Sequence, residues 1–210
     1  MTQLWTATTV EGETGQRLSA KPQKAPIPYV KVSRFFPDRA TIRAQFEWTV
    51  AIGRSRGRNV LEEISEGDVY RFYGAGADRV FTKDLVTSFL CHLRRWARLT
   101  IGAHHASSPQ VEVYSSGCWR KSTQDTIPAQ WRYVYAMNAN SMPVATRVDL
   151  VSSSPDRWLI FFSLRHALPV YLEPGSLLVH ETKTAYCIDE VRSIENDPLS
   201  CSAFLVGYLW

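Results

Sequence analysis

Asp125 is the side chain in this sequence that is best placed for acid/base chemistry. It lies within the segment CWRKSTQDTIPAQWRYVYAMN, residues 118–138, between a run of polar residues and an aromatic run. A carboxylate in an apolar pocket can act as a general acid or base in proton transfer, cyclisation, isomerisation or elimination. A turn aspartate that hydrogen-bonds its own backbone accounts for the residue equally well, so both interpretations stay open.

The aromatic run that follows predicts a strand with two different faces. Because side chains alternate along a strand, Trp131, Tyr133 and Tyr135 share one face, and Arg132 and Val134 share the other. The aromatic face can line a barrel pocket and bind a flat or polycyclic small molecule. An aromatic-rich hydrophobic core is the alternative for the same three rings.

Trp119, Thr123 and Cys187 complete the predicted substrate-binding set. Trp119 and Thr123 precede Asp125 in the same segment, whereas Cys187 follows much later in the sequence. A thiolate can act as a nucleophile, but no histidine is adjacent to Cys187 in the chain to activate it. A buried, unreactive thiol is therefore the alternative for this cysteine.

Composition limits the class of protein. The 210 residues, of which 45% are hydrophobic, suffice for one well-buried core. The four cysteines show neither CxxC spacing nor the density of a disulfide scaffold, so reduced thiols in a cytoplasmic protein are expected. We recognise no secretion signal and no apolar run long enough to span a membrane. Basic residues are scattered apart from Arg54, Arg56 and Arg58, which predicts no nucleic-acid partner.

The candidate residues need elements that position them, and the first half of the chain predicts helices. Residues 1–26 are rich in Thr, Gly, Lys and Pro and predict a flexible arm, whereas residues 27–210 predict a single domain. The spacing of apolar residues predicts one helix near 38–50 and a second over 82–99, capped by Thr82.

From residue 109 onward the pattern changes to period two. Residues 53–68 predict a loop before this change, and Gly74 and Gly76 predict a turn, because a dinucleotide site needs a third glycine. Short aromatic strands separated by Ser, Pro, Gly and Asp favour a sandwich or jelly roll, with the helices packed on one side. The predicted strands are QVEVYS, WRYVYAMN, ATRVDLVS, RWLIFFS, HALPVYL, GSLLVHE and CSAFLVGYL.

The order of these segments resembles the iron(II)/2-oxoglutarate-dependent oxygenases, in particular their prolyl-hydroxylase-like branch, over residues 27–209. PYVKVSRFFPDRATIRAQFE is similar to the family's opening strand and helix, and QVEVYSSGCWRKSTQDTIPAQWRYVYAMN to its metal-binding turn. PGSLLVHETKTAYCIDEVRSI resembles the strand of the distal ligand, and SCSAFLVGYL the closing strand. The resemblance implies an α+β fold: a double-stranded β-helix of jelly-roll or cupin type with two N-terminal helices on one side.

The resemblance also implies a set of iron ligands, which this sequence matches poorly. The family holds iron with a His-x-Asp pair and a later histidine, leaving positions for 2-oxoglutarate and oxygen. The pair falls on Thr123-Gln124-Asp125, where only the aspartate matches. The distal histidine falls on or beside Cys187, and the basic partner of 2-oxoglutarate falls on residues 200–202, which carry no positive charge. A threonine hydroxyl is a poor iron ligand, so we expect a degenerate triad with no bound metal.

Three functions remain open on these residues. The favoured one is a small-molecule-binding protein or non-redox enzyme of a biosynthetic pathway, which works without a cofactor through Asp125 and the aromatic pocket. The second is a functional hydroxylase that uses Fe(II) and 2-oxoglutarate through atypical ligands such as His166. The third is a non-catalytic pseudo-oxygenase subunit, in a homodimer or with a protein partner.

Overall fold

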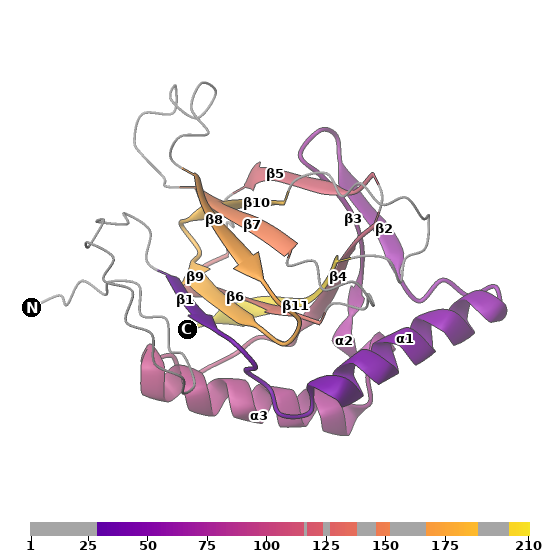
Figure 1. The fold of residues 1–210 in the computed structure, drawn as a ribbon, viewed down its shortest axis with the longest axis horizontal. Helices are drawn as coiled ribbons and strands as arrows, with labels where there is room; N and C mark the ends of the chain where they lie inside the picture. Colours follow the sequence, from indigo (N-terminus) through magenta and orange to yellow (C-terminus); the bar gives the residue numbers. More distant parts are fainter. Residues whose placement is uncertain (1–28, 116, 124–126, 138–145, 152–166, 189–201) are drawn as a thin grey trace, which may run out of the picture.

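The computed structural model describes residues 29–115, 117–123, 127–137, 146–151, 167–188 and 202–210 (Figure 1). The helices are α1 (Arg39–Ser55), α2 (Ala77–Val80) and α3 (Lys83–Thr100). The strands are β1 (Tyr29–Val32), β2 (Glu62–Glu66), β3 (Tyr70–Gly76), β4 (Gln110–Tyr114), β5 (Trp119–Thr123), β6 (Trp131–Ala136), β7 (Thr146–Val151), β8 (Ala167–Leu172), β9 (Leu177–Glu181), β10 (Ala185–Ile188) and β11 (Ser202–Leu209).

The strands form a folded-over antiparallel sheet in the order β1-β9-β6-β11-β4-β3-β5-β10-β7-β8, and β2 adds to β3. β3 changes partner along its length, because residues 73–76 pair with β4 whereas Tyr70 and Arg71 pair with β5. The sheet bends at this exchange. The layer that contains β5, β10, β7 and β8 therefore lies across an enclosed interior from the layer that contains β4, β11, β6 and β9 (Figure 1).

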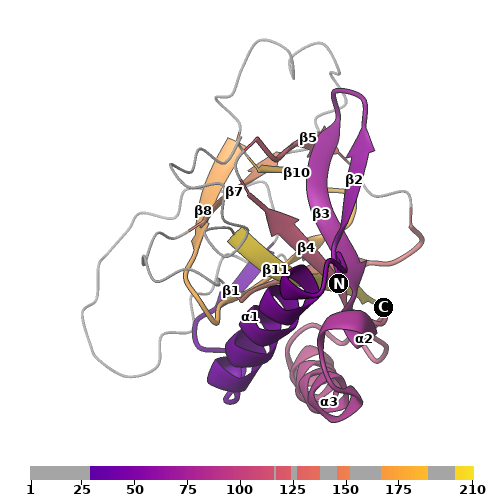
Figure 2. The same cartoon turned by 90° about the vertical axis from the view of Figure 1, so that its right-hand side faces the viewer.

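Two long helices cover one side of this barrel, as Figure 2 shows for α1 and α3. The predicted α+β fold, a double-stranded β-helix with helices packed on one side, is confirmed, and α2 adds a single further turn. No helix in the described part of the chain combines the length and the apolarity that crossing a bilayer requires. The predicted arm, residues 1–26, lies outside the described residues.

The helices pack through apolar stripes at helical spacing. On α3 the buried side chains recur every fourth residue, and α1 buries a similar stripe. Both stripes pack on the outer face of the sheet, and the shared core includes side chains from β4, β6, β9 and β11. The buried helical residues are Ile42, Phe46 and Val50 on α1 and Leu85, Phe89, Leu93 and Ala97 on α3.

The segment before α3 differs from the sequence prediction. The predicted loop over 53–68 contains β2, and the predicted glycine turn is part of β3, so the two strands form a hairpin. Gly74 lies where a Cβ would come within 2.6 Å of the Ile64 side chain of β2, so close approach of the two strands explains this glycine. A short strand of exposed charged residues has no apolar alternation, which is the signal that strand prediction needs.

Thr82 directly precedes α3, but its side chain does not form the predicted capping hydrogen bond. Instead, its backbone N–H donates to Oε1 of Gln45 on α1 at 3.1 Å. The hydroxyl of Thr49 donates to the carbonyl of Val80 at 2.9 Å, which adds a contact between α1 and the end of α2, just before α3. These contacts orient the two helices that support the sheet.

Candidate functional site

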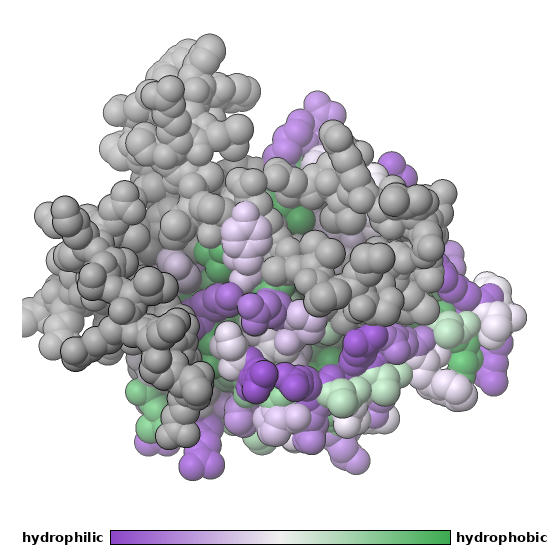
Figure 3. All heavy atoms as spheres, in the orientation of Figure 1, coloured by the Kyte–Doolittle hydropathy of each residue, from purple (hydrophilic) through white to green (hydrophobic). Residues whose placement is uncertain are grey.

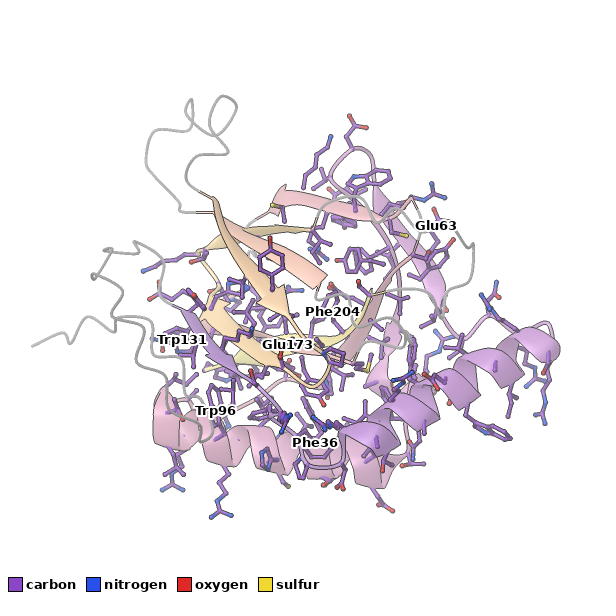
Figure 4. The ribbon with its side chains drawn as sticks, in the orientation of Figure 1. Phe36, Glu63, Trp96, Trp131, Glu173 and Phe204 are labelled. Carbon is purple, nitrogen blue, oxygen red and sulfur yellow. The ribbon has the colours of Figure 1, made fainter. Side chains whose placement is uncertain are left out.

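Alternation along the central strands separates two sets of side chains. On β4, Val111 and Val113 pack toward the helices, whereas Glu112 and Tyr114 face the barrel interior. The same rule holds on β6, β9 and β11, since neighbouring residues of each strand enter different hydrophobic clusters. Figure 4 shows this division, with Phe204 inside the barrel and Phe36 and Trp96 beside the helices.

The interior contains a buried charged network centred on Glu112. Oε1 of Glu112 accepts hydrogen bonds from Nη2 of Arg120 at 3.1 Å and from Nη2 of Arg132 at 3.0 Å. Oε2 accepts from the hydroxyl of Tyr114 at 2.9 Å. Nε of Arg120 donates to that same hydroxyl at 3.0 Å, and Nη1 of Arg132 donates to the hydroxyl of Tyr208 at 2.9 Å. Glu112, Arg120 and Arg132 are each less than 10% exposed, so charged hydrogen bonds replace water around them.

Aromatic rings enclose the two guanidinium groups. Arg120 lies over the rings of Tyr70, Phe72 and Tyr186, with centroid distances of 5.2, 5.0 and 5.0 Å. Arg132 lies 4.5 Å from the centroid of the same Tyr186 ring. Tyr186 therefore contacts both cations, and each such contact contributes about 0.5–2 kcal/mol when water is excluded.

The electrostatics of the network keep its groups in defined protonation states. Burial is the largest single influence on Arg120 and lowers its pKa, but Glu112 together with Tyr186 and Tyr114 raises it, and the pKa is raised overall. Burial, with the negative charge of Glu112, raises the pKa of Tyr114 well above its usual value. Arg120 therefore remains a cation, and Tyr114 remains a hydroxyl donor.

His180 lies at the same interior face, on β9 opposite Arg132 of β6. Its ring is fully buried and lies 5.6 Å from the ring of Tyr186. Nδ1 lies 2.9 Å from the backbone carbonyl of Glu181, and because a carbonyl only accepts, Nδ1 carries the proton of that hydrogen bond. The backbone contact therefore fixes the orientation of the imidazole.

The three aromatic residues predicted to line the pocket lie on the opposite face of β6, which corrects that prediction. Tyr133 and Tyr135 are buried under α3, with ring centroids 6.3 and 5.3 Å from that of Phe89. Trp131 packs against the same helix-side cluster. The alternation was predicted correctly, but Arg132 occupies the interior face. An aromatic residue fits either a pocket or a helix–sheet core, so the sequence pattern alone cannot decide between them.

The other predicted site residues are also dispersed. Trp119 alternates with Arg120 on β5 and pairs with Arg71 of β3, so it lies on the outer side of its strand. Cys187 is half-buried and points away from the interior, because its neighbours Tyr186 and Ile188 both face inward.

Of the two remaining predicted residues, Thr123 is the last residue of β5. The backbone of Thr123 pairs with that of Tyr186. Tyr186, which pairs with Thr123, faces the interior. It directly precedes Cys187, the residue on which the distal histidine of the family was predicted to fall. Asp125 lies outside the described residues.

Sequence reasoning missed Glu112, Arg120 and Arg132 as a group. The available signal was a charged residue at an alternating position between apolar neighbours, as in QVEVY and WRYVY. Such residues usually face solvent on a half-buried strand. Only the folded-over sheet shows that this face is turned inward.

The described residues do not fit a two-histidine, one-carboxylate iron site. Among them, no three His, Cys, Asp or Glu side chains gather closely enough to hold a metal ion. The interior carboxylate, Glu112, already accepts from two guanidinium groups and a hydroxyl. The charges of Arg120 and Arg132 also oppose a divalent cation at short range.

Comparison with solved structures places this geometry in a known fold. The structure is similar to a prolyl-4-hydroxylase from Pseudomonas putida, with 13% identity and a TM-score of 0.56 over 88% of this chain and 93% of that one. It is also similar to the non-heme α-ketoglutarate-dependent carbocyclase SnoK from nogalamycin biosynthesis, with 14% identity and a TM-score of 0.59 over 87% of this chain and 79% of SnoK. The epimerase SnoN from the same biosynthesis gives 12% identity and a TM-score of 0.58 over 87% and 76% of the two chains.

Sequence comparison alone finds no relative. No model of a known protein family matches the chain, and no curated protein does. The structural likeness shows that the chain has the double-stranded β-helix fold of 2-oxoglutarate oxygenases.

Proposed function

We propose that the protein binds a small molecule in the interior of its oxygenase-type barrel and acts on it without iron, by non-oxidative acid/base chemistry in a biosynthetic pathway. One observation carries the proposal. The barrel interior contains a carboxylate hydrogen-bonded to two arginines and a tyrosine. This network supplies hydrogen-bond donors and fixed charge rather than ligands for a divalent cation.

The structural neighbours support the biosynthetic part of the proposal. SnoK is named a non-heme α-ketoglutarate-dependent carbocyclase and SnoN a non-heme α-ketoglutarate-dependent epimerase, both of nogalamycin biosynthesis. Their names associate the fold with biosynthetic pathways, in proteins that depend on α-ketoglutarate. For this chain we propose cyclisation, isomerisation or elimination, with Asp125 as the acid or base.

The interior also bears on the pseudo-oxygenase alternative. A non-catalytic partner subunit needs an exposed apolar patch and has no need of buried charges. Figure 3 shows hydrophilic and apolar side chains intermixed over the face that includes α1 and α3. Among the described residues, the two most exposed large apolar side chains, Leu99 and Trp48, belong to different helices. The buried charges inside the barrel and the mixed face in Figure 3 favour a binding site inside the barrel over a protein-docking role.

The test is metal analysis of the purified protein, followed by calorimetric titration with 2-oxoglutarate after anaerobic loading with iron(II). We expect substoichiometric iron and no saturable 2-oxoglutarate binding. Stoichiometric iron together with saturable 2-oxoglutarate binding would contradict the proposal and favour a hydroxylase with ligands outside the described residues.

A second measurement addresses the acid/base role. Asp125→Asn keeps the size of the side chain and removes its proton-transfer capacity. We expect the variant to bind small molecules as the parent does and to lose turnover by 100-fold or more, about the usual contribution of a general acid or base. Equal turnover in the two proteins would assign Asp125 to the turn alone.

A further inference from the structure

We infer that the charged network is a binding site for a small organic carboxylate, and that Arg120 is the residue that binds it. This inference rests on the proposed function, since it names the ligand class of the same interior. It gives the interior a preference for anions, because this chain presents the guanidinium group of Arg120 there.

The geometry of Arg120 leaves one donor nitrogen for a ligand. Nε donates to the hydroxyl of Tyr114, and Nη2 donates to Glu112. Within the described residues, no hydrogen bond involves Nη1 of Arg120. Arg120 is 8% exposed. A guanidinium group held by two fixed partners has already lost its conformational freedom, so a carboxylate binds it with little additional ordering.

The rings around Arg120 determine what kind of carboxylate fits. Tyr70 is half-buried and Phe72 is buried, and together with Tyr186 they surround the guanidinium plane at about equal distances. Such walls exclude water and strengthen an ion pair formed between them. They also offer apolar contact to a planar body, so an aromatic carboxylate is favoured over acetate or phosphate.

The neighbouring charges favour a single negative charge. Glu66 forms a hydrogen bond with the hydroxyl of Tyr70, one of the rings around Arg120. Glu112 accepts from Arg120 itself. Because these carboxylates repel anions, a monoanion with an apolar body is preferred to a multiply charged ligand.

The test uses benzoate as the probe and benzamide as its neutral isostere, with binding followed by calorimetry and by thermal shift. We expect saturable benzoate binding and at least tenfold weaker binding of benzamide. Arg120→Lys keeps the positive charge but loses the planar fork, and it should weaken benzoate binding about tenfold or more. The matched control is Arg71→Met on adjacent β3, since Arg71 is exposed and paired with Glu63, and this variant should bind benzoate normally.

Three results would overturn the inference: no saturable benzoate binding up to about 10 mM, equal binding of benzamide, or unchanged binding by a folded Arg120→Lys protein. The comparison of the two ligands needs only the parent protein, so it remains decisive if the variant does not fold. Titration with Mn²⁺ in the same buffer separates the two proposals. Stoichiometric Mn²⁺ binding contradicts the iron-free function, whereas absence of both metal and benzoate binding contradicts only the carboxylate site.

Discussion

Removal of the negative charge from Glu112 is the most direct perturbation of the interior. Glu112→Gln preserves the size of the side chain but leaves the cations of Arg120 and Arg132 without the carboxylate oxygen that both contact at 3.0–3.1 Å. Breaking a buried ion pair by neutralising one partner costs about 3–5 kcal/mol. That loss is a large part of the free energy of unfolding of a typical domain, which is about 5–15 kcal/mol.

The assay is urea denaturation followed by far-UV circular dichroism. With a slope of about 2 kcal/mol per molar urea, the expected loss moves the midpoint down by about 1.5–2.5 M. Glu63→Gln provides the matched control, because Glu63 also pairs with an arginine, Arg71, at 3.0 Å but both side chains are more than 40% exposed. Exposed ion pairs contribute about 0–1 kcal/mol to the free energy of unfolding, so the control should lose at most that amount.

A loss below about 1 kcal/mol for Glu112→Gln, equal to that of the control, would refute the view that the network is a desolvated charge cluster. A second comparison tests the same reasoning from the opposite direction. Glu112→Leu combined with Arg120→Met and Arg132→Met removes all three charges at similar volume. We expect this triple variant to regain much of the lost stability, because no charge is left unpaired, and to lose benzoate binding.

Two other predictions concern the helix side of the sheet. Burial raises the pKa of Tyr135 from 10.0 to about 12, so between these values the unfolded chain loses a proton that the folded chain keeps, and stability falls as the pH rises. Between pH 9 and pH 11, the free energy of unfolding from urea denaturation should therefore fall by about 1 kcal/mol less in Tyr135→Phe than in the parent. An equal fall in the two proteins would contradict the raised pKa of Tyr135. A Cβ on Gly207 would lie 2.5 Å from the Tyr133 hydroxyl and 2.6 Å from Oγ of Ser107, so Gly207→Ala should destabilise the protein by about 1–3 kcal/mol. The penalty should shrink in a Tyr133→Phe background; an undiminished penalty would show that the hydroxyl is not the obstacle.

The order of elements was largely predictable because it depends on local periodicity. The stripe from Leu85 to Ala97 predicted α3, and the alternation in 110–114 and 131–136 predicted β4 and β6. The exposed strand β2 was missed, since Glu62–Glu66 has no apolar face to reveal it. Local spacing therefore predicts elements that bury one face and misses those that bury none.

The candidate site was less predictable, because it depends on which face of each strand the closed sheet encloses. Trp131, Tyr133 and Tyr135 were expected inside and lie on the helix side. Arg132 was assigned correctly to the opposite face, but that face is the interior. A strand pattern states that two faces differ without stating which face is covered by helices and which by the other half of the barrel.

The sequence by itself determined the helical stripes and the alternation of the strands, because each depends on residues that are close in the chain. Only the tertiary structure decided that Glu112, Arg120 and Arg132 meet, since they come from three strands and are joined by hydrogen bonds across the interior. A charged residue on a single strand is stable when it faces water. Three such residues become a buried network only when sheet closure removes the water and makes their mutual pairing the remaining means of satisfying their charges.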